Sequence, residues 1–246
     1  MPISNNFKSI FNKDFEVNFM QCLPNGLLKM TDLCNMLQLT AAEHSEIGGI
    51  SFIDMQQFDQ AWVLSRMRLE VIEVPKWKDI ITIKTWICNL ENSRSIRALE
   101  VLVNGKKMIG VETFWAVFNT KTRRPESLCL PHEHYEKFNN SRGTNIEISR
   151  ISVFENASLV AEKKVHLSDL DMVNHVNNVR YLEWCLDLID DKLILNQQIE
   201  SFDMNFLKEL SIKDIVTIEK RVEGTAIFFN VKKESKPVFL LQINLL

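Results

Sequence analysis

This sequence lacks the features that mark a metalloprotein, a secreted protein or a membrane protein. Its five cysteines are odd in number, widely spaced and without a CxxC pair, so neither a zinc site nor a disulfide framework is indicated. No apolar run approaches the roughly 20 residues of a membrane span. The first residues lack the charged start and apolar core of a signal peptide. We expect a reduced, cytoplasmic protein with no membrane span and no metal.

The charge balance argues against nucleic acid as a partner. Net charge is −3, charged residues make up 25% and apolar residues 46% of the chain. These are the proportions of a globular protein with a large core, without a basic signature. GxSxG, P-loop and GxGxxG patterns are also missing, and we expect no cofactor. A length of 246 residues is sufficient for two domains.

Two segments have the apolar spacing of helices. Residues 27–47 carry apolar side chains at every third or fourth position, and Gly48 offers a stop. Residues 176–190 repeat the pattern at Val179, Leu182 and Leu186. Further apolar residues widen the face of this second helix, which we expect to be buried on most sides.

Most of the remaining chain reads as strand. Six segments are rich in β-branched and aromatic residues: 62–74, 79–90, 95–105, 107–120, 214–222 and 225–233. Asn104 and Gly105 predict a tight hairpin turn, because both residue types accept positive φ. The polar segment 131–149 has little periodicity and reads as the connection between two halves.

The two halves share a repeat. "KDIITIK" at 78–84 and "KDIVTIE" at 213–219 are offset by 213 − 78 = 135 residues, with five of seven positions identical. Each copy follows one of the two helices, so the order is helix then strands, twice. We predict two helix-wrapped antiparallel sheets packed together.

The polar stretch before the second helix carries a resemblance. "DLDMVNHVNNVRYLEW" at 169–184 resembles the signature of acyl-acyl-carrier-protein thioesterases and, more loosely, of the hotdog-fold thioesterase superfamily. "WVLSR" at 62–66, "VPKWKDIITIKTW" at 74–86 and "FWAVFNTKTRRP" at 114–125 support it. The resemblance extends from about residue 15 to the end of the chain.

The resemblance implies an α+β fold, a tandem double hotdog in which each half is a long helix wrapped by an antiparallel sheet. Residues 1–140 would form an N-terminal hotdog domain that shapes the acyl pocket. Residues 141–160 would be the linker, and residues 161–246 the catalytic hotdog domain.

The implied activity is hydrolysis of the thioester of fatty acyl-acyl carrier protein, releasing free fatty acid in fatty acid biosynthesis. Acyl carrier protein is then the partner. Two alternatives stay open: an acyl-CoA thioesterase, and a non-catalytic acyl-binding hotdog protein. Acyl chain length, saturation preference and oligomeric state, including a homodimer, also stay open.

The family's D-x-N-x-H motif and later glutamate map onto Asp171, His175 and Glu209. Plant members carry a cysteine after that glutamate, where this chain has Leu210, so a thiol nucleophile there is excluded. The family asparagine falls on Val173, and Asn174 follows it. Either Asn174 supplies the amide from a shifted backbone, or the enzyme works without it.

These residue types suit thioester hydrolysis. A carboxylate can act as general base, and the first turn of a helix near Val176 offers N–H groups to an oxyanion. Asn177 and Asn178 would hold backbone groups and orient the loop, while Trp62 would line the acyl pocket. Helix capping by Asp171 or Asn174, a purely structural His175 and ordinary core packing of Trp62 are the competing interpretations.

The repeat strengthens the assignment of Glu209. Its counterpart is residue 209 − 135 = 74, which is Val74, so the position has no evident packing reason to be charged. A solvated edge-strand residue is the alternative. Two basic groups could dock an acidic carrier protein: Lys121, Arg123 and Arg124, or Arg94 and Arg97.

Overall fold

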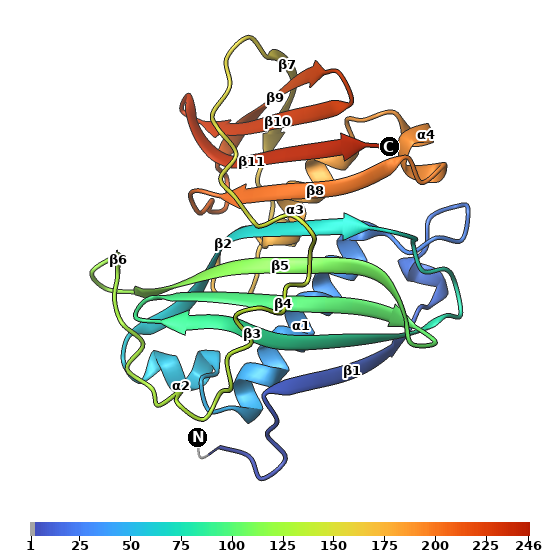
Figure 1. Cartoon of the computed structure of the whole chain (residues 1–246). Helices are drawn as coiled ribbons and strands as arrows, with labels where there is room; N and C mark the ends of the chain where they lie inside the picture. Colours follow the sequence, from blue (N-terminus) through green and yellow to red (C-terminus); the bar gives the residue numbers. More distant parts are fainter. Residues whose placement is uncertain (1–2) are drawn as a thin grey trace.

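The computed structural model describes residues 3–246, whose strands form one antiparallel sheet (Figure 1). The strands are β1 (Ile10–Glu16), β2 (Gln60–Val71), β3 (Ile80–Glu91), β4 (Arg94–Val103), β5 (Lys106–Asn119), β6 (Arg124–Pro125), β7 (Ser158–Lys164), β8 (Ile199–Phe206), β9 (Ile215–Glu223), β10 (Ala226–Lys233) and β11 (Lys236–Leu245). Their order is β1-β3-β4-β5-β2-β8-β11-β10-β9-β7, with the short β6 paired to β5.

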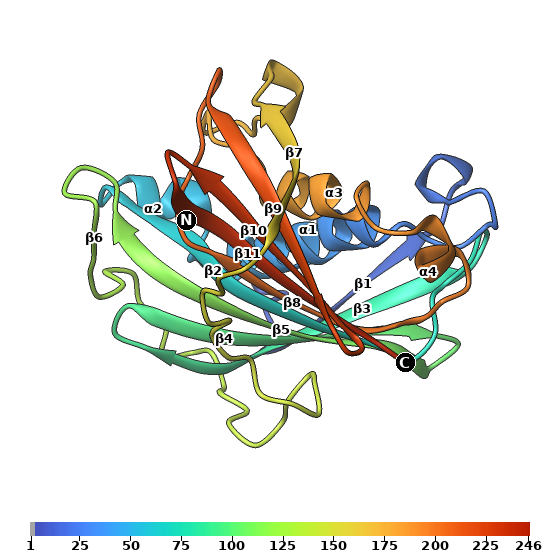
Figure 2. The same cartoon turned by 90° about the horizontal axis from the view of Figure 1, so that it is seen from above.

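Two helices lie on the concave face of the sheet (Figure 2). They are α1 (Met30–Ile47) and α3 (Asn178–Leu186), which contact each other. Two short helices, α2 (Phe52–Gln56) and α4 (Asp191–Leu195), follow α1 and α3 in the chain. One hydrophobic core contains Leu33 and Leu37 of α1 together with Leu182 of α3. The predicted end of the first helix is confirmed, with Gly48 after Ile47, but α1 begins at Met30 and not at residue 27, because Leu27 and Leu28 form β-bridges to Lys76 and Cys22.

The second helix is shorter than predicted. The sequence pattern indicated residues 176–190, but α3 covers Asn178–Leu186 only. Asp190 has an extended backbone, and its side chain accepts the N–H of Lys192, which caps the start of α4. This cap favours a new helix over continuation of the old one.

The two helix-wrapped sheets expected from the sequence are joined into one sheet. β2 and β8 pair edge to edge, which joins the strands of the two halves into a continuous sheet. Arg68 of β2 lies opposite Asp203 of β8, and its guanidinium donates to that carboxylate at 2.5 Å and to Glu70 at 3.0 Å. Pairing satisfies backbone groups that two free edges would expose.

The repeat is confirmed in the structure. β3 and β9 each stand second from an end of the sheet order. Lys78 and Lys213, just before these strands, have positive φ angles of 71° and 69°. The predicted hairpin turn is also confirmed, with φ of 50° at Asn104 and 78° at Gly105.

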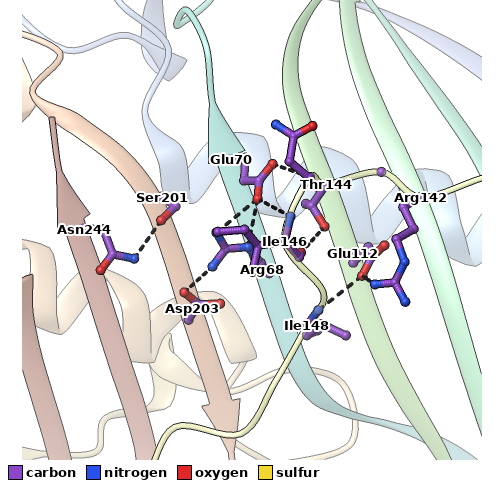
Figure 3. Close-up of polar contacts among 12 residues, drawn as sticks. Arg68, Glu70, Glu112, Arg142, Thr144, Ile146, Ile148, Ser201, Asp203 and Asn244 are labelled. Atoms are coloured by element: carbon purple, nitrogen blue, oxygen red, sulfur yellow. Dashed lines mark hydrogen bonds and ion pairs between the residues drawn. The ribbon is translucent and has the colours of Figure 1, made fainter.

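The connection between the halves crosses the convex face, opposite the helices (Figures 1 and 2). Glu70 accepts the N–H of Asn145 at 2.6 Å and of Ile146 at 3.0 Å, and Glu112 accepts the N–H of Ile148 at 3.3 Å (Figure 3). These carboxylates therefore fasten a segment that has no strand partners of its own.

Across residues 3–246, the structure contains no helix that is both long enough and apolar enough to cross a membrane.

Candidate active site

A tight turn leads into α3. The Asp171 carboxylate accepts the N–H of Val173 at 3.0 Å and of His175 at 3.2 Å, and the Asp171 N–H donates to the His175 carbonyl at 2.8 Å. The Asp171 carboxylate thus holds the backbone of the turn by hydrogen bonds and thereby fixes the position of the His175 Cα atom.

Asn174 occupies the one position of this turn with positive φ, 65°. Asparagine accepts this left-handed conformation far better than a β-branched residue such as Val173 would. The Asn174 residue is exposed, and so is Val173. The turn alone therefore gives a reason for asparagine at 174.

Most backbone N–H groups at the start of α3 already have hydrogen-bond acceptors. The Val176 N–H donates to the Leu210 carbonyl at 2.9 Å, and its side chain is buried in the core. The Asn177 side chain caps the helix by accepting the N–H of Val179 at 3.0 Å. In the described part of the chain, the Asn178 N–H has no acceptor. The N–H group at this helix end that can serve an oxyanion is therefore that of Asn178.

Glu209 lies beside His175. It follows β8, where the N–H groups of Leu207 and Lys208 both donate to the Val238 carbonyl and turn the chain. The Glu209 Oε2 atom lies 3.4 Å from the His175 Nε2 atom, and both side chains are about one-third exposed, at 32% and 33%. The structure thus brings Asp171, His175 and Glu209 together although 38 residues (209 − 171) separate them in the chain.

The sequence analysis did not predict that two further residues, Arg123 and Tyr181, lie beside these three. The Arg123 guanidinium, from the turn between β5 and β6, forms an ion pair with the same Oε2 atom of Glu209. Tyr181 of α3 is buried, and burial chiefly raises the pKa of its phenol, with the Glu209 and Asp171 carboxylates adding to the rise. Tyr181 could have been predicted from the sequence, because it is a tyrosine among the apolar residues of a predicted helix face. The Arg123 contact spans 86 residues and leaves no local signal.

A cavity of about 320 Å³ lies between the C-terminal half of α1 and the sheet. Trp62 and Trp115 line it, and the Trp62 indole N–H donates to the Ile50 carbonyl at 3.3 Å. β2 and β8 run antiparallel, so the start of β2, with Trp62, lies at the sheet end where β8 leads into Glu209. The cavity and the polar group therefore share one end of the molecule.

Arg97 does not belong to a docking surface, contrary to expectation. It is 4% exposed and donates to the His44 Nδ1 atom at 2.8 Å and to the Thr85 hydroxyl at 3.2 Å. Alternation along β4 turns Arg97 inward, while Arg94 at the strand start stays exposed. Arg124 is exposed, and Lys121 pairs with Asp59 at 2.8 Å.

Comparison with known proteins places this geometry in a family. The family model "Acyl-ACP thioesterase N-terminal domain" matches residues 8–137, and "Acyl-ACP thioesterase C-terminal domain" matches residues 154–244. Together they span most of the chain.

Curated relatives and solved structures agree. The chain is 25% identical over 230 residues to oleoyl-acyl carrier protein thioesterase 2 of Arabidopsis thaliana, covering 84% of this chain and 61% of the relative. It is 22% identical to a dodecanoyl-[acyl-carrier-protein] hydrolase of Cinnamomum camphora, covering 87% of this chain and 60% of the relative. The chain thus spans about 60% of the length of these two relatives.

An acyl-ACP thioesterase structure from Bacteroides thetaiotaomicron superposes with a TM-score of 0.89 at 28% identity, covering 97% of this chain and 98% of that one. A 12:0-ACP thioesterase structure from Umbellularia californica shares the fold, with a TM-score of 0.83 at 20% identity and coverage of 97% and 98%. With both family models matched along most of its length, the chain belongs to the acyl-ACP thioesterase family.

Proposed function

We propose that this protein hydrolyses the thioester of fatty acyl-acyl carrier protein and releases a free fatty acid. The observation that carries the proposal is the contact between Glu209 and His175 at the start of a buried helix, 3.4 Å between Oε2 and Nε2. The largely apolar cavity at Trp62 supplies room for an acyl chain, and membership of the thioesterase family supplies the reaction class.

Each polar group then has a step. Glu209 takes a proton from a water molecule, and the oxygen of that water attacks the carbonyl carbon of the thioester. The resulting oxyanion is stabilised by the Asn178 N–H and the positive end of α3. The carbon–sulfur bond breaks, and the proton on Glu209 passes to the leaving thiolate. His175 orients Glu209, and Asp171 positions His175 through the backbone of the turn.

We further propose that the chain is a tandem of two hotdog domains close to the boundaries expected from the sequence. Residues 1–140 form the domain that shapes the acyl pocket, and a segment around 141–160 links it to the catalytic domain. β7 starts at Ser158 and pairs with β9, so it belongs to the second domain. The mirrored strand order about the β2–β8 pair supports this division.

We propose that the acidic carrier protein docks on the exposed arginine next to the site, Arg124. Arg124 is exposed and directly follows Arg123, which contacts Glu209. A carrier bound there would deliver its thioester to the end of the sheet that holds Glu209.

The test is Glu209→Gln, assayed with dodecanoyl-, palmitoyl- and oleoyl-acyl carrier protein. Glutamine keeps the size and most hydrogen bonds of the side chain but cannot accept the proton. We expect kcat to fall by ~100-fold or more, the usual effect of losing a general base. Circular dichroism and fatty-acid binding should match the parent protein.

Three outcomes would contradict parts of the proposal. Near-normal turnover by Glu209→Gln would remove Glu209 as base and shift that role to Asp171. A parent enzyme with higher kcat/KM for acyl-CoA would replace the carrier protein as donor. Binding of acyl chains without hydrolysis of either donor would indicate an acyl-binding protein.

A further inference from the structure

The turn that carries Asp171 and His175 has a structural copy in the first half. The Asp171 N–H donates to the His175 carbonyl at 2.8 Å, and the Leu23 N–H donates to the Leu27 carbonyl at 2.8 Å. Both pairs are offset by the same amount, 171 − 23 = 148 and 175 − 27 = 148. Leu23 and Leu27 therefore stand where the second half has its aspartate and histidine.

The counterpart of Glu209 follows from a second matched bond. The residue after His175 donates its N–H to the carbonyl of the residue after Glu209, at 2.9 Å. In the first half, the residue after Leu27 makes the same bond to the residue after Val74, at 2.8 Å. The first half therefore has a complete copy of the site backbone, with two leucines and a valine in place of the polar groups.

This copy still has a cavity, of about 250 Å³. It lies between the start of α1 and the end of α3, and its walls include Leu23, Leu27, Val74, Leu186, Ile194 and Phe202. Its walls therefore include the copied positions themselves, whereas the cavity at Trp62 is lined by the C-terminal half of α1 and by strands of the first half.

A cavity with a largely apolar wall and no catalytic groups at the copied positions suits a bound ligand that is itself apolar. Apolar side chains make up much of its wall, and covering them with an apolar ligand would remove that surface from water. Because the same backbone frame holds Asp171, His175 and Glu209 in the second half, where the acyl thioester is proposed to react, an acyl chain is the ligand that fits by equivalence.

We propose that this cavity is a second, non-catalytic binding site for the acyl chain of an acyl thioester. The inference rests on the proposed function, since the ligand is identified through the catalytic counterpart. No base stands at the copied positions, so a thioester bound there is retained rather than hydrolysed.

The rim of the cavity selects a neutral linkage over a free fatty acid. Glu183 and Asp187 of the α3 end both line it. Burial, followed by the nearby Glu183 carboxylate, raises the pKa of Asp187. Lys29 also lines the rim, where its Nζ donates to the Met20 carbonyl at 2.9 Å, and Glu183 is paired with Arg180. Asp187 forms no ion pair within residues 3–246, so a fatty-acid carboxylate beside it would meet like charge, whereas a thioester carbonyl would not.

The experiment is titration calorimetry of the full chain with the amide analogue of dodecanoyl-pantetheine, which cannot be hydrolysed as a thioester. We expect about two ligands per chain, one in each cavity. Val74→Trp fills the first-half cavity and should leave one ligand per chain with hydrolysis unchanged. Ala42→Trp fills the cavity beside Trp62 and should also leave one ligand but abolish hydrolysis. Free dodecanoate should bind the first-half cavity about tenfold more weakly than the amide, measured in Ala42→Trp.

The outcomes separate this inference from the proposed function. One ligand per chain in the parent protein, unaffected by Val74→Trp, overturns the second site and leaves the hydrolase proposal standing. No binding and no hydrolysis in the parent protein overturns both. Equal binding of dodecanoate and the amide overturns the choice of a thioester. If Val74→Trp does not fold, Leu186→Trp fills the same cavity from the opposite wall.

Discussion

Arg123 and Glu209 form an ion pair in which the guanidinium contacts the same carboxylate oxygen that faces His175. An arginine first identified as a candidate for carrier docking is thus bonded to the proposed general base. The Arg123 side chain is 61% exposed, so the pair is partly screened by water. A positioning role for Arg123 and a docking role for its neighbour Arg124 are therefore separable by mutation.

Arg123→Ala should lower kcat for carrier-borne and CoA-borne substrates alike, because Glu209 loses a contact that orients it. An exposed ion pair contributes at most about 1 kcal/mol, so we expect a fall of up to ~5-fold. Arg124→Ala should instead raise KM for acyl-acyl carrier protein alone and make its salt dependence shallower. Steady-state kinetics on both donors checks this. Equal effects of the two substitutions would argue against the division of roles.

Asn174→Gly should keep nearly full activity. Glycine accepts the positive φ of 65° at this position without cost but has no amide side chain. Asn174→Val should unfold the turn that Asp171 holds, because a β-branched residue is strained there. A large fall in kcat for the glycine variant, with an intact fold, would instead assign the amide a role in catalysis.

His44 should make the protein sensitive to acid. Burial, with a further contribution from the neighbouring Arg97 charge, lowers the pKa of His44 to about 3. The unfolded chain protonates this histidine near pH 6.5, so stability is lost as pH falls from about 6.5 towards 3. Each pH unit in that window costs about 1.4 kcal/mol.

Urea unfolding at pH 6.5 and pH 4.5 checks this. The parent protein should lose about 2–3 kcal/mol more than His44→Gln, which keeps an acceptor and a donor but does not titrate in this range. His132→Gln, which replaces a partly exposed histidine of the connection, serves as control. An identical pH dependence of the parent and His44→Gln would contradict the assignment.

Arg68→Met should destabilise the junction between β2 and β8. The side chains of Arg68 and Asp203 are 6% and 11% exposed, and removing the cation leaves a buried carboxylate without its partner. Breaking a buried pair costs about 3–5 kcal/mol, and the double variant Arg68→Met/Asp203→Leu should recover much of that loss. Arg180→Met, which removes a more exposed pair with Glu183, should cost below about 1 kcal/mol in the same urea unfolding assay. A double variant no more stable than Arg68→Met would indicate that Asp203 has a further partner.

Local pattern determined a large part of this protein. Apolar spacing and Gly48 placed the first helix, because a helix face and its end depend on neighbouring residues. β-branched and aromatic composition located six strands, and the two "KDI" copies revealed the repeat that links Val74 to Glu209. The Asp171–His175 turn was readable because its hydrogen bonds lie within five residues.

Tertiary structure decided what depends on distant partners. β8 was not recognised because Ser201, Asp203 and Asn205 give it a polar sequence, and their buried places are tolerable only beside β2, β11 and the connection. The inward position of Arg97 depends on acceptors from α1 and β3. The ion pair of Arg123 with Glu209 joins residues 86 positions apart. Which strands pair, and which charges meet, is set by the path of the whole chain, because burial of a polar group depends on partners that no local window contains.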